Sequence, residues 1–267
     1  MLLGDRMAQG ISLSLAGGGA RGFVHVGVLK VFLEEKLPVV EIAGSSMGAI
    51  VAAYYAVHGT VEPLEEFARS LDRRTMFHYM DPCLPRHSLM KGDRLRRVLT
   101  KWFGDGRIEE CAIPLSIIAT ELRTGKPVVF REGRIVEALM ASAAIPGLLP
   151  AVRIGTEYYV DGGVAEPLPL SALQKQNTLR VGVALPAMRD VPPPITAQPR
   201  LTEVLGLVYA TARHRLFEEW RDAVILYPNG GTMGDTLSFQ RSAEFVRNGE
   251  TTAREALANI KLLLQEE

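Results

Sequence analysis

The sequence predicts a three-layer α/β/α fold with a mostly parallel central sheet. Two observations favour this class. The chain opens with segments that alternate between strand and helix patterns, an order that builds parallel sheets covered by helices. A glycine-containing loop follows each of the first two expected strands. Because the chain has 267 residues, 47% of them hydrophobic, it can bury a large core, and we expect one domain over residues 1–267.

The expected elements follow from hydrophobic spacing and turn residues. Apolar and β-branched runs predict strands at residues 11–15, 38–43, 114–120, 127–130, 179–184 and 223–227, with two short strands flanking Gly155. Helical spacing predicts helices at residues 22–36, 47–58, 135–143, 201–220 and 251–264. Residues 61–106 are expected to be polar helix and loop, and the prolines at 192–194 predict an exposed loop.

Residues 44–48 read Gly-Ser-Ser-Met-Gly and match Gly-x-Ser-x-Gly with Ser46 at the centre. They lie between an expected strand and an Ala-rich expected helix, which is the setting of a nucleophile elbow. Gly44 and Gly48 give the room that a sharp turn needs, and a helix N-terminus favours developing negative charge. Ser46 is therefore the candidate nucleophile and Ser45 a small turn residue. The alternative is a purely structural turn.

The first expected strand leads directly into a glycine loop, Gly-Gly-Gly-Ala-Arg-Gly at residues 17–22. Its uncovered backbone N–H groups suit an oxyanion. The loop also satisfies Gly-x-Gly-x-x-Gly, and Glu41 lies about where a ribose-binding acid would be, so a dinucleotide-binding protein is the competing interpretation. A dinucleotide site leaves the serine at the next strand end unexplained, and we therefore favour an oxyanion hole.

Asp161 follows an expected strand and precedes two glycines that allow a tight turn beside it. A serine hydroxyl is a poor nucleophile until a neighbouring base takes its proton. Among the five histidines, His214 would complete the order Ser46, Asp161, His214 of an α/β-hydrolase triad. That histidine falls inside the expected helix 201–220, where a surface position is the simpler interpretation. The base is then either Asp161 itself or His214.

Four ordered motifs resemble the patatin-like phospholipase family, and the simple layout is most similar to its small bacterial members. They are Gly-Gly-Gly-Ala-Arg-Gly at 17–22, Gly-Ser-Ser-Met-Gly at 44–48, Ala-Ser-Ala-Ala-Ile-Pro at 141–146 and Asp-Gly-Gly at 161–163. The stretch Gly-Phe-Val-His-Val-Gly-Val-Leu at 22–29 is also similar to the segment that follows the family's glycine loop. The resemblance covers roughly residues 11–185.

The resemblance implies a hydrolase of lipid carboxylic esters that uses a Ser-Asp dyad without histidine. Ser46 would be the nucleophile, and Asp161 the base that takes its proton. The resemblance implies neither a metal nor an organic cofactor. A catalytically silent scaffold with the same fold is a further alternative. The implied oxyanion-loop residues are Gly17, Gly18, Gly19 and Arg21.

Residues 76–95 are the expected border of an acyl pocket. The segment combines apolar side chains with cations, which would suit a lipid with an anionic head group. The alternative is ordinary packing beside a solvated loop. The apolar candidates are Phe77, Tyr79, Met80, Leu84, Leu89 and Met90, and the cations are Arg86, Lys91 and Arg94.

The charge balance and the cysteines narrow the class of protein further. Basic and acidic residues number 30 each, so no nucleic-acid partner is expected. Cys83 and Cys111 lack metal-ligand spacing and are interpreted as reduced thiols of a cytoplasmic protein. A basic cluster at helical spacing is interpreted as a solvated helix face; its members are Arg94, Arg96, Arg97 and Lys101.

The N-terminal residues lack a signal-peptide pattern, and the longest apolar run, residues 49–57, is too short to span a bilayer. We therefore expect a cytoplasmic protein that at most contacts a membrane surface transiently. The expected partner is a lipid or ester substrate, and the sequence leaves the oligomeric state open.

Overall fold

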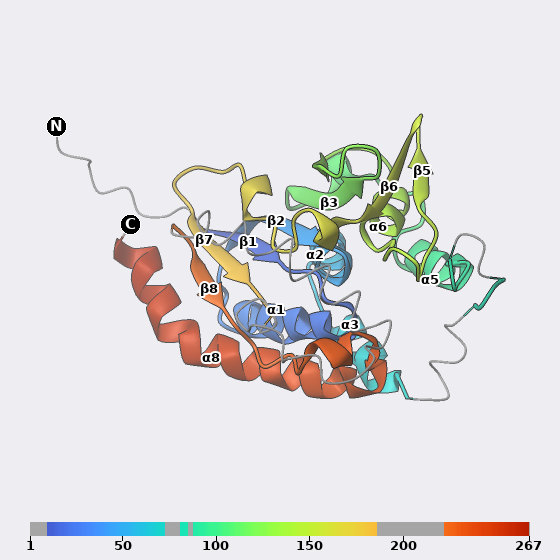
Figure 1. Ribbon diagram of the computed structural model, residues 1–267. Helices are drawn as coiled ribbons and strands as arrows, with labels where there is room; N and C mark the ends of the chain where they lie inside the picture. The colour runs from blue at the N-terminus through green and yellow to red at the C-terminus, as the bar shows by residue number, and fades with distance from the viewer. Residues whose placement is uncertain (1–9, 73–80, 85–87, 186–221, 267) are drawn as a thin grey trace, which may run out of the picture.

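The computed structural model describes residues 10–72, 81–84, 88–185 and 222–266. A central sheet flanked by helices dominates them, as Figure 1 shows. The strands are β1 (Ile11–Leu15), β2 (Val39–Ser45), β3 (Leu115–Glu121), β4 (Pro127–Phe130), β5 (Val152–Ile154), β6 (Glu157–Asp161), β7 (Leu179–Val183) and β8 (Val224–Leu226). The α-helices are α1 (Val24–Glu34), α2 (Met47–His58), α3 (Glu62–Ser70), α5 (Asp93–Phe103), α6 (Ile135–Ser142) and α8 (Ser242–Glu266). The 3₁₀ turns are η1 (Gly19–Phe23), η2 (Ile108–Glu110), η3 (Gly162–Val164), η4 (Leu170–Ala172), η7 (Met233–Leu237) and η8 (Phe239–Arg241).

The described strands form one sheet in the order β5-β6-β3-β2-β1-β7-β8, with β4 paired to β3. Strands β3, β2, β1, β7 and β8 are parallel. Strands β4 and β6 run antiparallel to β3, and β5 runs antiparallel to β6. The predicted fold class, an α/β fold with a mostly parallel sheet between helices, is therefore confirmed.

The two faces of the sheet are covered differently. Alternate side chains such as Leu13 and Ile42 pack into one large core with helices α1, α2, α6 and α8. The side chains that point the other way, among them Ala43 and Ile118, pack against the segment around η4. The expected helix at residues 201–220 lies outside the described residues.

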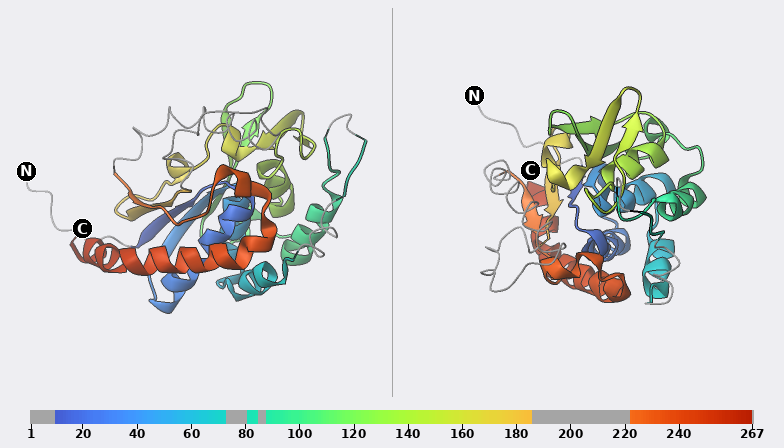
Figure 2. Two further views of the ribbon diagram at one scale, coloured as in Figure 1. Left: turned by 60° about the horizontal axis from the view of Figure 1, so that its bottom comes forward. Right: turned by 45° about the vertical axis from the view of Figure 1, so that its right-hand side comes forward.

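Helix α8 packs along α1, and Figure 2 (left) shows it running beneath the length of the sheet. Two glycines allow this close approach. A methyl group on Gly27 would collide with the Val246 carbonyl, and one on Gly249 would collide with the Val24 carbonyl. The C-terminal helix thereby contacts the helix that follows the glycine loop.

Most predicted elements agree with the structure to within two residues at each end. Helix α8 is the main exception among the described residues, because it begins at Ser242 rather than at residue 251. Residues 19–23 form the 3₁₀ turn η1 before α1 rather than a loop. The polar segment 61–106 contains helices α3 and α5.

Sheet register brings the two glycine-containing loops together. Strands β1 and β2 are parallel neighbours, with Leu15 opposite Gly44 at their carboxyl ends. The loops that leave both strands therefore emerge side by side at one edge of the sheet, which is where ligands bind in open parallel sheets.

Candidate active site

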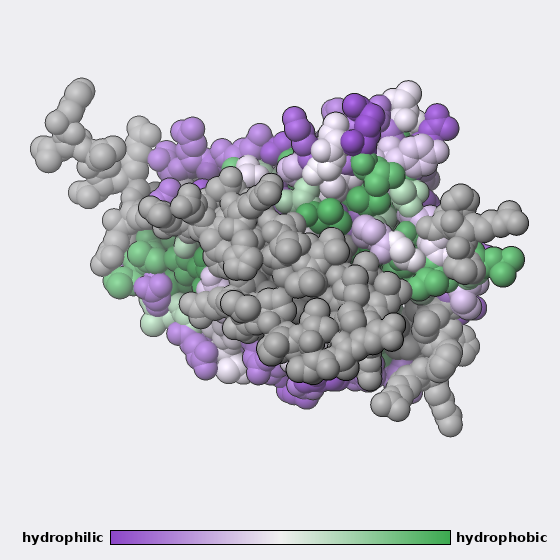
Figure 3. All heavy atoms as spheres, viewed as in Figure 1, coloured by the Kyte–Doolittle hydropathy of each residue, from purple (hydrophilic) through white to green (hydrophobic). Residues whose placement is uncertain are grey.

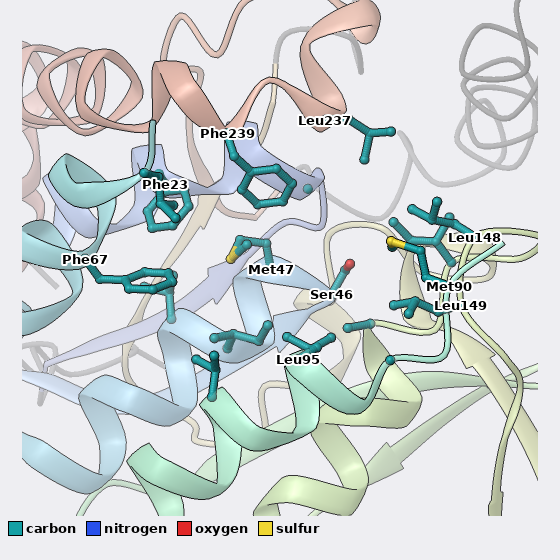
Figure 4. A pocket seen from close by; sticks show the side chains of 18 of the residues that line it. Phe23, Ser46, Met47, Phe67, Met90, Leu95, Leu148, Leu149, Leu237 and Phe239 are labelled. Atoms are coloured by element: carbon teal, nitrogen blue, oxygen red, sulfur yellow. The ribbon is translucent and has the colours of Figure 1, made fainter. Parts of the chain in front are cut away.

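Ser46 occupies the sharp turn between β2 and α2. Its φ of 53° and ψ of −124° form a backbone conformation that residues with a side chain rarely adopt. The flanking glycines allow the turn: a methyl group on Gly44 would collide with the backbone of Gly48, and one on Gly48 would collide with the Leu15 carbonyl. The turn presents the Ser46 side chain to a pocket, as Figure 4 shows.

Two hydrogen bonds hold Ser46. Its hydroxyl donates to Oδ2 of Asp161 at 2.6 Å, and its backbone N–H donates to Oγ of Ser142 on α6 at 2.8 Å. Ser142 was not among the predicted site residues, although it lies within the motif at 141–146. The neighbouring Ser45 is fully buried, and its hydroxyl has no hydrogen-bond partner among the described residues. Of the two serines, only Ser46 lines the pocket.

Asp161 reaches Ser46 across the intervening strand β3. Ser45 pairs with Ile118 of β3, and the next β3 residue, Ala119, pairs with Asp161 at the end of β6. The chain then turns at Gly162, where a methyl group would collide with the Ile118 carbonyl. This tight turn lets Oδ1 of Asp161 accept the Gly163 N–H at 2.7 Å while Oδ2 stays on the Ser46 hydroxyl.

The pKa of the Asp161 carboxyl group lies close to neutral pH. Burial raises its pKa to about 7, although hydrogen bonds from Ser46 and from the Gly163 N–H act in the opposite direction. A carboxylate with a pKa near 7 is a stronger base than one near 4, and it is still largely ionised at slightly alkaline pH.

The glycine loop lies against Ser46. A methyl group on Gly17 would be 3.1 Å from Cβ of Ser46. The Gly17 N–H donates to the Pro167 carbonyl at 2.9 Å and is therefore already used. The N–H groups of Gly18 and Gly19 donate to none of the described residues, and Gly19 lines the pocket beside Ser46. The two N–H groups that the resemblance implies as oxyanion donors, those of Gly18 and Gly19, are thus uncommitted among the described residues.

Arg21 and His25 are buried beside this loop. The Arg21 Nη2 atom lies 3.7 Å from the position that a methyl group on Gly18 would take. Nε2 of His25 lies 2.7 Å from the Ala16 carbonyl, and burial lowers the His25 pKa to about 4. The neutral ring therefore donates to that carbonyl and supports the start of the loop.

The structure contradicts the role that a dinucleotide site would give to Glu41. Its carboxylate accepts the Ser12 hydroxyl at 2.6 Å and the backbone N–H groups of Gln174 and Lys175 at 3.0 and 2.8 Å. Four further residues of β2 separate Glu41 from the carboxyl end of the strand. The acid therefore lies inside the sheet and not at the edge where the glycine loop would hold a pyrophosphate.

Neither of the two described histidines hydrogen-bonds to Ser46, the candidate nucleophile. His25 contacts the Ala16 carbonyl, and Nε2 of the exposed His58 lies 3.2 Å from the Trp102 carbonyl. His214, the candidate for an α/β-hydrolase triad, lies outside the described residues. The direct hydrogen bond from Ser46 to Asp161 occupies the place where a triad would insert an imidazole.

An apolar pocket of about 180 Å³ opens beside Ser46. Figure 4 shows Phe23 and Phe67 on one side of Ser46, and Met90, Leu148 and Leu149 on the other. Helices α2, α3 and α5 form much of its wall, so its side chains come from segments far apart in the sequence. Their lining side chains are Met47, Ile50, Val51, Leu64, Phe67, Leu95, Val98 and Trp102.

The predicted acyl-pocket segment contributes only partly. Met90 lines the pocket, whereas the Leu84 side chain is 81% exposed and does not line it. The assignment of Leu84 to the pocket wall is therefore wrong. Leu89 is 40% exposed and also does not line the pocket. The remaining predicted residues of this segment that lie outside the described ranges are Phe77, Tyr79, Met80 and Arg86.

Within residues 10–72, 81–84, 88–185 and 222–266, no cluster of metal-binding side chains occurs. Cys83 and Cys111 are both free thiols. The described helices include none that is both long and apolar enough to cross a lipid bilayer.

Residues 13–173 match the family model of patatin-like phospholipases. The chain belongs to this family. The matched range contains the glycine loop, the nucleophile elbow and the Asp-Gly-Gly turn, so the resemblance predicted from these motifs is confirmed. A phospholipase hydrolyses lipid esters, and the family therefore agrees with the predicted class of lipid acyl hydrolase.

Curated relatives extend the match. An uncharacterized NTE family protein of Mycobacterium tuberculosis is 34% identical over 195 residues, which are 70% of this chain and 54% of the relative. Lysophospholipase NTE1 of Yarrowia lipolytica is 29% identical over 63% of this chain and 12% of its own length. The chain thus spans about half the length of the NTE family relative and a small part of the yeast one.

Among solved structures, VipD from Legionella pneumophila shares the fold. Its TM-score is 0.62 at 15% sequence identity, over 95% of this chain and 67% of that one.

Proposed function

We propose that this chain hydrolyses carboxylic esters of lipids with a Ser46–Asp161 dyad. The observation that carries the proposal is the 2.6 Å hydrogen bond from the Ser46 hydroxyl to a buried carboxyl group at the mouth of an apolar pocket. Family membership supports the same class of reaction. The name of the yeast relative, a lysophospholipase, makes lysophospholipids one candidate substrate class.

In the first half of the reaction, Asp161 takes the hydroxyl proton as Oγ of Ser46 attacks the ester carbonyl carbon. Negative charge then develops on the carbonyl oxygen, and the N–H groups of Gly18 and Gly19 stabilise it together with the N-terminus of α2. Asp161 returns its proton to the departing alcohol oxygen as the carbon–oxygen bond breaks. An acyl group remains bound to Ser46.

In the second half, water attacks the acyl-enzyme and Asp161 takes a proton from it. The same oxyanion donors act again, and the proton returns to Oγ of Ser46 as the fatty acid leaves. No step requires a metal or an organic cofactor, because the charge is handled by backbone donors and one carboxyl group.

The pocket gives the acyl chain its place. Its wall is built almost wholly from aliphatic and aromatic side chains, and each methylene moved from water into such surroundings contributes about 0.8 kcal/mol. The chain-length preference should therefore depend on the helices α2, α3 and α5 rather than on Leu84.

We also propose that residues 1–267 fold as one domain. Helix α8 lies beyond the matched family range, yet its crossing with α1 at Gly27 and Gly249 joins it to the helix that follows the glycine loop.

The test is mass spectrometry after labelling with a fluorophosphonate probe, combined with turnover of p-nitrophenyl esters and lysophospholipids. We expect one adduct, on Ser46, and loss of both labelling and turnover in Ser46→Ala. Ser45→Ala is the matched control and should retain both. An adduct on Ser45, or turnover that survives Ser46→Ala, contradicts the proposal. NAD or FAD that raises the melting temperature while Ser46 stays unlabelled would instead favour the dinucleotide alternative.

A further inference from the structure

The mouth of the pocket combines exposed apolar side chains with cations. Leu84, Leu89 and Leu237 are 81%, 40% and 41% exposed, and they are three of the seven large hydrophobic side chains that are exposed among the described residues. Leu237 lines the pocket directly. Figure 3 shows hydrophobic surface at the right-hand edge of the molecule, where Figure 1 shows the chain that leads into α5.

Backbone hydrogen bonds attach Leu84 and Leu89 to this mouth. The Cys83 N–H donates to the Leu89 carbonyl at 3.1 Å, and the Leu89 N–H donates to the Gly147 carbonyl at 3.0 Å. Next in the chain is the pocket residue Met90, whose N–H donates to the Leu148 carbonyl at 3.0 Å. Leu89 therefore directly precedes the pocket residue Met90, and Leu84 follows Cys83, which is hydrogen-bonded to Leu89.

Helix α5 places positive charge along the same pocket. Successive residues of an α-helix are 100° apart, so Leu95, Val98 and Trp102 form one stripe, which lines the pocket. Shifted by one residue, Arg94, Arg97 and Lys101 form the adjacent stripe, on the side away from the buried Leu99 and Phe103. The cations consequently border the pocket wall on its solvent side.

Two of the cations near the mouth are exposed to solvent. Lys91 and Arg97 are exposed, and neither makes an ion pair with any residue that the structure describes. Two acids of α3 lie further along the pocket: burial, together with the nearby carboxylates of Glu62 and Glu66, raises the pKa of Tyr54, which is about two turns along α2 from Ser46. At the mouth, Lys91, Arg94 and Arg97 outnumber the two acids there, the pocket residue Asp81 and the exposed Asp93, by one charge.

We propose that this mouth surface, made of Leu84, Leu89, Leu237, Lys91 and Arg97, docks on an anionic lipid bilayer. The leucines enter the boundary between head groups and acyl chains, while the two cations contact anionic head groups. This orientation places the opening beside Ser46 against the membrane, so a lipid passes from the bilayer to the nucleophile without crossing water. The inference deepens the proposed function and depends on it for the fate of the lipid.

Vesicle sedimentation with the Ser46→Ala chain separates docking from chemistry. We expect binding to vesicles of phosphatidylcholine with phosphatidylglycerol, much weaker binding to phosphatidylcholine alone, and weakening by salt. One cation at an anionic surface strengthens binding about fivefold, so Lys91→Gln with Arg97→Gln should weaken it about 30-fold. The matched control is Lys36→Gln with Lys175→Gln, which removes the same charge from exposed positions near the opposite edge of the sheet and should bind like the parent.

Leu84→Asp tests the apolar part of the surface, with Leu262→Asp near the C-terminal end of α8 as its control. We expect Leu84→Asp to abolish most vesicle binding and Leu262→Asp to leave it unchanged. In the chain with Ser46 intact, both variants should hydrolyse a water-soluble p-nitrophenyl ester at the wild-type rate, because that substrate needs no membrane.

Several results would overturn the docking surface. Binding that is equal for neutral and anionic vesicles, or no vesicle binding at all, would contradict it. So would an equal loss of vesicle binding in the Lys91/Arg97 variant and in the Lys36/Lys175 control, or binding to an acidic protein or nucleic acid in place of vesicles. Failure of the proposed catalytic function shows itself differently, as absence of soluble-ester turnover with vesicle binding intact.

Discussion

Two buried acids on the same sheet, Glu41 and Asp161, have opposite surroundings. The Glu41 carboxylate accepts one hydroxyl and two backbone N–H groups, and it faces no pocket. The Asp161 carboxyl accepts one backbone N–H and the hydroxyl of Ser46, which does line a pocket. Fixed donors around a carboxylate stabilise a fold, whereas a carboxyl whose partner is a reactive hydroxyl is prepared to exchange a proton with it.

The largest expected effect is a loss of catalysis when Asp161 is replaced but not when Glu41 is replaced. Asp161→Asn keeps the shape and removes the proton acceptor, so kcat should fall about 10³-fold. Glu41→Gln should leave kcat within a few-fold of wild type, and steady-state kinetics on a soluble ester measures both. A catalytic defect in Glu41→Gln as large as that in Asp161→Asn would remove the distinction between the two sites.

The oxyanion loop should give the next largest effect. Gly19 has a φ of 59°, and a methyl group there would collide with the Thr236 backbone, so Gly19→Ala must move the loop. Loss of one oxyanion donor typically lowers kcat about 10²-fold or more, and we expect that loss here.

Gly59 offers a matched control because its φ is 67° and nothing lies within 4 Å of the added methyl group. Gly59→Ala should lower the free energy of unfolding by about 1 kcal/mol through backbone strain alone and leave kcat unchanged. Equal kcat in the two alanine variants would show that the glycine loop does not hold the oxyanion.

A smaller effect should appear in chain-length selectivity. Phe67 and Trp102 line the pocket in edge-to-face contact, with ring centroids 5.1 Å apart. Replacing both by Ala should flatten the increase in kcat/KM from acetyl to medium-chain p-nitrophenyl esters, by about tenfold for the longer chains. Leu84→Ala is the control and should keep the wild-type profile, because that side chain points to solvent. A flattened profile in Leu84→Ala would instead show that the acyl chain binds against residues 76–95, as the sequence suggested.

The smallest effect concerns stability, and its sign depends on pH. Because burial raises the Asp161 pKa from 3.8 to about 7, the folded state binds the proton more tightly than the unfolded state does. Wild-type stability therefore decreases as pH rises from about 4 to about 7. Asp161→Asn removes this dependence and should be more stable than wild type at pH 8 by about 1 kcal/mol or more. At pH 4, where Asp161 is protonated, the gain in stability over wild type should be smaller.

Glu41→Gln should show no such gain. Its three donors would lose a charged acceptor, so the free energy of unfolding should fall by about 1–3 kcal/mol at pH 8. Thermal melts of both variants at the two pH values provide the measurement. A stabilised Glu41→Gln, or a destabilised Asp161→Asn at pH 8, would contradict the assigned surroundings.

The sequence predicted the sheet and its loops well because they depend on local signals. Residues 11–15, 47–58 and 127–130 agree with the structure at both ends, since apolar periodicity and turn residues define them. The start of α8 was missed because Gly249 weakens the helical pattern. Contact with the Val24 carbonyl explains that glycine, and such a contact between distant segments has no local signal.

The candidate site divides in the same way. The sequence could single out Ser46 and Asp161 because each lies at a strand end beside glycines that permit a tight turn, and the structure brings their side chains together. The pocket wall was misplaced because Phe67 and Trp102 belong to the apolar faces of helices, and such a face looks the same in sequence whether it covers a core or a cavity. Only the packing of α3 and α5 around α2 distinguishes the two.

The most direct test of the dyad is the pH dependence of the rate at which a fluorophosphonate labels Ser46. If Asp161 activates the serine, the rate in the wild type should rise with a midpoint near pH 7, where the buried carboxyl ionises, and then level off. In Asp161→Asn the labelling should be slow and should lack that midpoint. A wild-type rate, or an unchanged midpoint, in Asp161→Asn would show that another group is the base.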